Sequence, residues 1–171
     1  TDEITFSSSH LINNYFNNYP EPVRDFLKKF REKYSADDIK KKILEEGINL
    51  EVAHMGASAL GISGQGDIDL YILCKKEDFN IYAPRIEKIF GRRVSGISIY
   101  KWQLNIDRFE VEMYLTDPKT PSMKEQIDVF EKLKNNKELL KEYESIKSSV
   151  DGSSFREYMR RKYEFFNKIL E

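Results

Sequence analysis

The sequence has little cysteine, no long apolar run and almost no net charge. The single Cys74 excludes a disulfide within the chain, and a reducing, cytoplasmic setting is the expectation. No apolar run approaches the roughly 20 residues that cross a bilayer, so no membrane partner is expected. With 28 basic against 29 acidic residues the net charge is −1, and no overall field attracts nucleic acid. Any contact with RNA would need a local basic patch.

What is present indicates one globular domain, or one with a helical extension, since 40% of the 171 residues are hydrophobic and 33% are charged. The order of patterns is helices, a mixed sheet with one inserted helix, then helices, which predicts an α+β fold with segregated helices. We expect an N-terminal segment over residues 1–20, either a tag-like tail or a short helix. The core should cover 21–118 and C-terminal helices 119–171, with a break near Asn135.

The stretch over residues 54–73 organises the chain. A strand over 48–53 is expected to lead into residues 56–66, which are small and hold four glycines and two serines. From Asp67 onward, acidic and apolar residues alternate, as in a strand with one face in a core. Successive side chains of a strand point to opposite faces, so Asp67 and Asp69 share one face, roughly 7 Å apart along the backbone.

Two carboxylates on one face repel each other, and a divalent cation would relieve the repulsion. Mg²⁺ prefers one or two protein carboxylates together with phosphate and water oxygens. Glycines in the preceding loop allow positive φ and close approach of a ligand, and successive backbone N–H groups can form an anion nest. The stretch therefore predicts a phosphate cradle beside a metal-binding edge.

A second acidic strand is expected in a hairpin over residues 102–115, with a turn at 107–108. Its carboxylates, Glu110 and Glu112, alternate with apolar residues and share one face. If this strand lies beside the strand over 67–73, one of the two completes a cluster of three carboxylates. Parity alone does not separate them.

Gly56-Ala57-Ser58, eight further residues and Asp67-Ile68-Asp69-Leu70 resemble the signature of the DNA polymerase beta-like nucleotidyltransferase superfamily. That signature is a Gly-Ser pair, a spacer and Asp-hydrophobic-Asp on a strand, with a third carboxylate from an adjacent strand. His54-Met-Gly-Ala-Ser-Ala-Leu-Gly61 resembles the His-Ile-Gly-Ser-Thr-Ser-Val-Pro-Gly opening of its GrpB family. Tyr143-Glu-Ser-Ile-Lys147 is similar to that family's Tyr-Glu-x-Leu-Lys helix. Ala57 and Gly61 depart from the family pattern, and the usual Lys-Pro before the acidic strand is absent.

The resemblance implies a small mixed sheet flanked by helices, with a C-terminal helical segment. It implies catalytic, metal-binding roles for Asp67, Asp69 and Glu112, since the third acidic residue of similar hairpins commonly lies where Glu112 does. Three carboxylates can hold two Mg²⁺ ions, which Mn²⁺ could replace. The expected reaction moves a nucleoside monophosphate from a nucleoside triphosphate to a hydroxyl or similar acceptor.

Gly56 and Ser58 are expected to bind the phosphates, and a cation should help to neutralise them. The candidates are Lys101, Arg92, Arg93 and Lys75, which the sequence does not separate, and Lys101 is the one assigned to the site. The acceptor stays open between a small molecule, a protein side chain and an RNA end. His54 is expected to be a core or loop residue, and residues 160–162 (Arg-Arg-Lys) a solvated helix face. The alternative function is a ligand-binding or interaction module with a weakened site, which the departures at Ala57 and before Asp67 favour.

Overall fold

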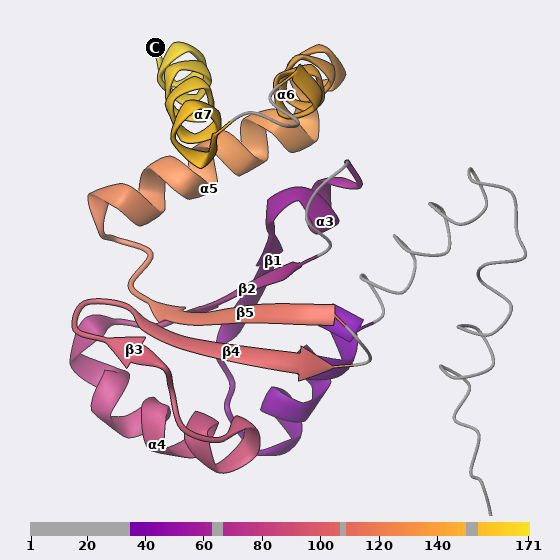
Figure 1. Cartoon of the computed structure of the whole chain (residues 1–171). Helices are drawn as coiled ribbons and strands as arrows, with labels where there is room; N and C mark the ends of the chain where they lie inside the picture. The colour runs from indigo at the N-terminus through magenta and orange to yellow at the C-terminus, as the bar shows by residue number, and fades with distance from the viewer. Residues whose placement is uncertain (1–34, 63–66, 107–108, 150–153) are drawn as a thin grey trace, which may run out of the picture.

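The computed structural model describes residues 35–62, 67–106, 109–149 and 154–171 (Figure 1). The expectations for residues 1–20 and for the turn at 107–108 lie outside these ranges. Within these ranges a helix covers residues 35–45, and it is followed by Gly47, which adopts a φ of 72°. Ile48 stays bonded to this helix end through the carbonyl of Ile43. The first strand therefore begins at Glu51, and its expected start at residue 48 was wrong.

Five strands form one mixed sheet in the order β1-β2-β5-β4-β3. The strands are β1 (Glu51–Met55), β2 (Ile68–Leu73), β3 (Ser95–Gly96), β4 (Tyr100–Ile106) and β5 (Phe109–Thr116). The central pair β2 and β5 is parallel, and the other pairs are antiparallel. The connection between β2 and β5 contains the 3₁₀ turn η1 (Lys76–Asp78), helix α4 (Phe79–Phe90) and strands β3 and β4. The predicted α+β fold with a mixed sheet is confirmed.

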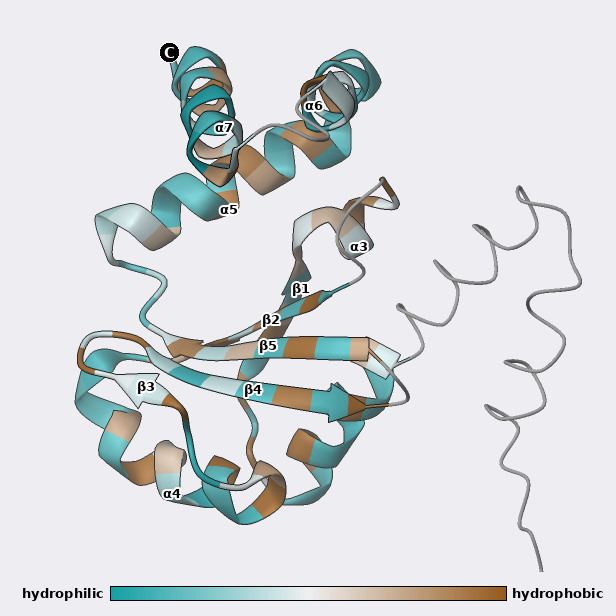
Figure 2. Ribbon diagram, viewed as in Figure 1, coloured by the Kyte–Doolittle hydropathy of each residue, from teal (hydrophilic) through white to brown (hydrophobic). Residues whose placement is uncertain are grey.

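One face of the sheet is apolar and packs against α4 and the helix over residues 35–45 (Figure 1). Strands β2, β4 and β5 carry alternating hydrophilic and hydrophobic residues (Figure 2). The fully buried side chains of this face are Ile68, Leu70, Ile72, Trp102, Val111, Met113 and Leu115. Burial of large apolar side chains contributes roughly 1.5–3 kcal/mol each, which fixes the register of the strands. The acidic residues between them must then point to the other face.

That other face looks toward the C-terminal helices α5 (Pro121–Asn135), α6 (Lys137–Ser149) and α7 (Phe155–Leu170). These helices pack with the short helix α3 (Gly56–Leu60) around a second apolar cluster: Ile62, Val129, Leu133, Tyr143, Phe165 and Ile169. The break between α5 and α6 near Asn135 is confirmed. No helix of the described residues is long and apolar enough to cross a membrane.

Candidate functional site

The face of the sheet opposite the main core is polar, and it gathers the predicted acidic residues. Asp69 on β2 pairs in register with Glu112 on the parallel strand β5, so the two side chains lie side by side on one face. Asp67 immediately precedes β2 and has the same parity as Asp69. Two tyrosines extend the face along the same strands, because Tyr71 and Tyr114 are stacked with ring centroids 4.9 Å apart.

The carboxylate of Asp69 is the electrostatic centre of this face. Its pKa rises from 3.8 to about 7, mainly because the group is buried and also because the charges of Asp67 and Glu112 lie nearby. The positive charges of Lys162 and Lys101 act to lower the pKa of Asp69. The site thus holds more negative charge than its own lysines neutralise, which is the condition under which a cation binds.

Glu112 is held by two partners. The ammonium of Lys101 donates to Glu112 Oε1 at 2.6 Å, and the hydroxyl of Tyr114 donates to Oε2. Burial raises the pKa of Glu112, but these hydrogen bonds outweigh it and the net direction is down, so the carboxylate is ionised. Glu110 lies on the same face but is exposed and accepts a hydrogen bond from Gln103. Of the two candidates, Glu112 is therefore the one whose charge acts on Asp69.

In the part of the chain that the structure describes, no three acidic, histidine or cysteine side chains stand close enough together to ligate one ion. Glu112, the third predicted carboxylate, instead accepts hydrogen bonds from Lys101 and Tyr114. Asp67 and Asp69 are a donor set of two carboxylates, and Mg²⁺ in proteins commonly uses one or two carboxylates and fills its octahedron with phosphate and water oxygens. The residues therefore fit one divalent cation at Asp67 and Asp69.

The stretch after β1 was expected to be an open loop, but Gly56–Leu60 form the short helix α3. Gly56 has a φ of 77°, and a Cβ added there would collide with a carboxylate oxygen of Asp69. Glycine at this position thus lets the backbone of α3 approach Asp69 directly.

Gly56→Ala is expected to destabilise the fold by about 1–3 kcal/mol, because it combines a strained positive φ with this collision. Differential scanning calorimetry at pH 7 would measure the loss. Gly61→Ala is the matched control, since Gly61 has a similar φ of 69° but open space around its added Cβ. Equal losses at the two glycines would show that the approach to Asp69 has no separate cost.

His54 and Ser58 form a pair beside Gly56. The Nε2 of His54 lies 2.9 Å from the Ser58 hydroxyl oxygen. The pKa of His54 falls to about 4, mainly because the ring is buried and also because of the charge of Lys40, while the charge of Asp37 opposes the fall. The imidazole is thus neutral at pH 7. Its Nε2 can accept a hydrogen bond from the Ser58 hydroxyl, and this bond orients the Ser58 side chain.

The four candidate cations separate in space. Lys101 reaches Glu112, whereas Arg93 pairs with Glu87 of α4 at 2.9 Å and lies 4.3 Å from the ring centroid of Tyr100. Tyr100 belongs to the apolar face, so Arg93 lies on the wrong side of the sheet. Arg92 lines a surface hollow with Arg93 and Glu87, and Lys75 is exposed beyond the far end of β2.

Two lysines that the sequence did not assign to the site face the acidic pair. Lys147 on α6 and Lys162 on α7 are half-buried, and burial lowers the pKa of each. The charges of Asp67 and Asp69 raise the pKa of both lysines, whereas the charge of Lys162 lowers the pKa of Lys147. Lys147 ends the Tyr-Glu-Ser-Ile-Lys motif, which was the signal that could have identified it. Residues 160–162 are only in part the solvated face that was expected.

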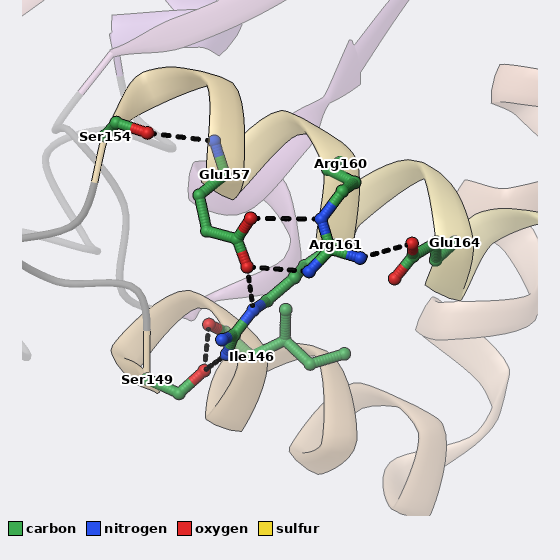
Figure 3. Close-up of polar contacts among 7 residues, drawn as sticks. All are labelled: Ile146, Ser149, Ser154, Glu157, Arg160, Arg161 and Glu164. Atoms are coloured by element: carbon green, nitrogen blue, oxygen red, sulfur yellow. Dashed lines mark hydrogen bonds and ion pairs between the residues drawn. The ribbon is translucent and has the colours of Figure 1, made fainter.

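A polar network fixes the two helices that carry these lysines (Figure 3). Glu157 accepts hydrogen bonds from Arg160 and from Arg161, and Arg161 also donates to Ser149 at the end of α6 at 3.3 Å. Ser154 caps α7 by accepting from the backbone N–H of Glu157 at 3.3 Å, as its sequence predicts. The hydrogen bond between Arg161 and Ser149 thus joins the start of α7 to the end of α6.

Comparisons with known proteins agree with this geometry. The family model described as GrpB protein matches residues 21–171. The crystal structure of the conserved protein GrpB from Enterococcus faecalis is similar with a TM-score of 0.57 and 15% identity, covering 82% of this chain and 93% of that chain. No curated protein sequence matches this one.

Two structures of Cid1 share the fold. One is described as an RNA terminal uridylyl transferase, with a TM-score of 0.55 and 11% identity over 81% of this chain and 44% of that chain. The other is Cid1 poly(U) polymerase bound to MgGTP, with a TM-score of 0.56 and 13% identity over 84% of this chain and 47% of that chain. This chain spans less than half of either Cid1 chain. The likeness confirms the predicted nucleotidyltransferase-like fold.

Proposed function

This chain belongs to the GrpB family of DNA polymerase beta-like nucleotidyltransferases, and from that premise we propose that it transfers a nucleoside monophosphate from a nucleoside triphosphate to a hydroxyl or similar acceptor, with Mg²⁺ or Mn²⁺ as cofactor. The observation that carries the proposal is the sheet face on which Asp67, Asp69 and Glu112 meet, opposite two lysines from α6 and α7. Carboxylates for a metal and lysines for phosphates are the two parts that such a transfer needs.

The residues of the site would have two roles, binding the metal ion and binding the phosphates of the nucleotide. Asp67 and Asp69 would hold a divalent cation, which when bound neutralises the phosphates and stabilises the leaving pyrophosphate. Lys147 and Lys162 repel each other unless a polyanion lies between them, and a triphosphate carries enough negative charge to satisfy both. Gly56 and Ser58 would approach the same phosphates through their backbone N–H groups, since the Ser58 hydroxyl is bonded to His54.

Glu112 would face the acceptor. In the transfer, the acceptor oxygen forms a bond to the α-phosphorus, and the bond from that phosphorus to the bridging oxygen of pyrophosphate breaks. The pyrophosphate leaves with the electron pair, and the acceptor proton passes to a carboxylate oxygen of Glu112 and then to water. Positioning and charge stabilisation account for most of the acceleration in reactions of this kind.

Isothermal titration with Mg²⁺ and each of the four nucleoside triphosphates tests the proposal. We expect at least one nucleotide to bind only when Mg²⁺ is present, and Asp67→Asn should abolish this Mg²⁺-dependent binding. Asp128→Asn, an exposed carboxylate on α5, is the control. Metal-independent binding, or binding unchanged in Asp67→Asn, would contradict the metal site.

One observation favours the second function, a ligand-binding module without catalysis. Glu112 is engaged by Lys101 and Tyr114 rather than turned toward Asp69. Pyrophosphate release measured across alcohols, proteins and RNA ends separates the two functions. Tight nucleotide binding without pyrophosphate from any acceptor would favour the module.

A further inference from the structure

The ion pair between Lys101 and Glu112 bears on how many metal ions the site uses. We propose that the Lys101 ammonium lies beside Glu112 where a second metal ion, next to the acceptor, would otherwise bind, so that the site takes one divalent ion instead of two. This proposal rests on the nucleotidyltransferase function proposed above. The ion lies at Asp67 and Asp69, and Lys101 supplies the second positive charge beside Glu112.

The first argument is geometric. Lys101 is on β4, the antiparallel neighbour of β5, and pairs in register with Tyr114. Its side chain crosses diagonally to Glu112 and ends 2.6 Å from Oε1, with 27% of the lysine side chain and 24% of the glutamate side chain exposed. A pair this short and this enclosed is a charge-assisted hydrogen bond, not a loose surface contact.

The second argument concerns what else holds Glu112. The Tyr114 hydroxyl donates to the second oxygen, and the Tyr114 ring is itself stacked on Tyr71. The ammonium of Lys101 also lies 5.5 Å from the centroid of the Tyr114 ring. The carboxylate is thus fixed from two sides by groups that are fixed in turn, and turning it toward a metal would break both hydrogen bonds.

The third argument is electrostatic. A second divalent ion at Glu112 would lie within a few ångströms of the Lys101 ammonium, and like charges at about 4 Å repel strongly at the dielectric of a protein surface. Lys101 cannot retreat to bulk water without abandoning Glu112. The cluster already contains the positive charge that a second ion would bring, which agrees with the lack of any three-residue ligand set among the described side chains.

In the transfer, this charge has a defined place. Glu112 receives the acceptor proton, and the Lys101 ammonium beside it stabilises the negative charge that develops on the attacking oxygen. Lys101 therefore acts at the acceptor end of the reaction, whereas Lys147 and Lys162 act at the phosphate end. No proton leaves Lys101, and its charge is unchanged through the reaction.

Counting bound Mn²⁺ by electron paramagnetic resonance tests this assignment. The 171-residue chain is titrated with Mn²⁺ in the presence of α,β-methylene analogues of the four nucleoside triphosphates, and dipolar broadening reports paired ions. We expect one Mn²⁺ per wild-type chain and a second, broadened Mn²⁺ in Lys101→Met. The affinity for the second ion should rise by about tenfold or more in that variant. Lys124→Met, which removes an exposed lysine of α5, should bind one ion as the wild type does.

Every other count of bound Mn²⁺ contradicts the assignment of Lys101, and one of them also contradicts the proposed function. Two ions in the wild type, or one ion in both wild type and Lys101→Met, would overturn the assignment and leave the nucleotidyltransferase proposal standing. No nucleotide-dependent Mn²⁺ in the wild type would overturn both. If Lys101→Met fails to fold by circular dichroism, Lys101→Gln is counted in its place, because it removes the charge and keeps a hydrogen-bond donor.

Discussion

Asp69→Asn is expected to make the metal-free protein more stable at pH 8 and, at the same time, to abolish metal-dependent nucleotide binding. Folding places an ionised Asp69 in a half-buried position beside Asp67 and Glu112, where the charge is unfavourable. The rise in pKa from 3.8 to about 7 corresponds to at most about 4 kcal/mol. Relief of half this cost should raise Tm by about 4–8 °C in a chain of this size.

The pH dependence of this effect has a definite sign. Well below pH 4, Asp69 is protonated in both folded and unfolded chains and contributes nothing. Between pH 4 and 7 the folded protein retains a proton that the unfolded chain has lost, so the stability of the wild type falls as pH rises through this window. The stability advantage of Asp69→Asn should therefore grow from pH 4 to 7 and level off above it. Urea unfolding in EDTA at pH 4, 6 and 8 measures this difference.

With Mg²⁺ and nucleotide present, the order should reverse. A ligand at 100 times its Kd stabilises the wild type by about 2.7 kcal/mol, and Asp69→Asn should gain none of it. Nucleotidyl transfer should fall by about a thousandfold or more, since a bound metal ion contributes several kcal/mol to the transition state. Asp128→Asn should change neither quantity. A variant that is less stable without metal and still binds nucleotide with Mg²⁺ would contradict the role of Asp69.

Lys147→Met and Lys162→Met are each expected to weaken triphosphate binding by about 10- to 100-fold. Each removes one charged hydrogen-bond donor to phosphate, which contributes about 1.5–3 kcal/mol. Binding of the nucleoside monophosphate should change little, because the β- and γ-phosphates are the groups that the two lysines would contact. The ratio of the two affinities, measured by titration, is the diagnostic quantity.

The control for these lysines is Lys141→Met, whose side chain is 74% exposed on α6 and pairs with Glu138 at 3.6 Å. Exposed pairs of this kind contribute about 0–1 kcal/mol, so nucleotide affinity should be unchanged. Equal weakening of monophosphate and triphosphate binding in Lys162→Met would mean that the lysine supports the fold of α7 instead of holding phosphates.

The alternation of apolar and acidic residues in β2 and β5 allowed most of the acidic face of the sheet to be predicted from the sequence. Apolar residues on β2 and β5 occupy one core, and the requirement to bury them forces Asp69 and Glu112 onto the same opposite face. The pairing of these two strands was a hypothesis, and the parallel register confirms it. The hairpin that joins β4 to β5 also determines that Lys101 lies one diagonal step from Glu112.

Other features depend on tertiary contacts that no local pattern contains. The helical turn of α3 could not be read from glycine and serine, which lower helix propensity, because its packing against β1 and β2 stabilises it. Which face of α6 and α7 carries a functional lysine depends on how the helices sit over the sheet. The periodicity of Lys147 and Lys162 indicates only that each is polar.

The parallel pairing of β2 with β5 has one last consequence. Direct strand-to-strand hydrogen bonds fix Asp69 beside Glu112, so their spacing is independent of the length of the chain between them. That chain forms α4 and the β3–β4 edge, and its turns near Lys75 and Ser98 are exposed. Peptide insertion or circular permutation at Ser98 should therefore leave the two acidic groups in place, which makes this connection a natural attachment point for an added recognition module.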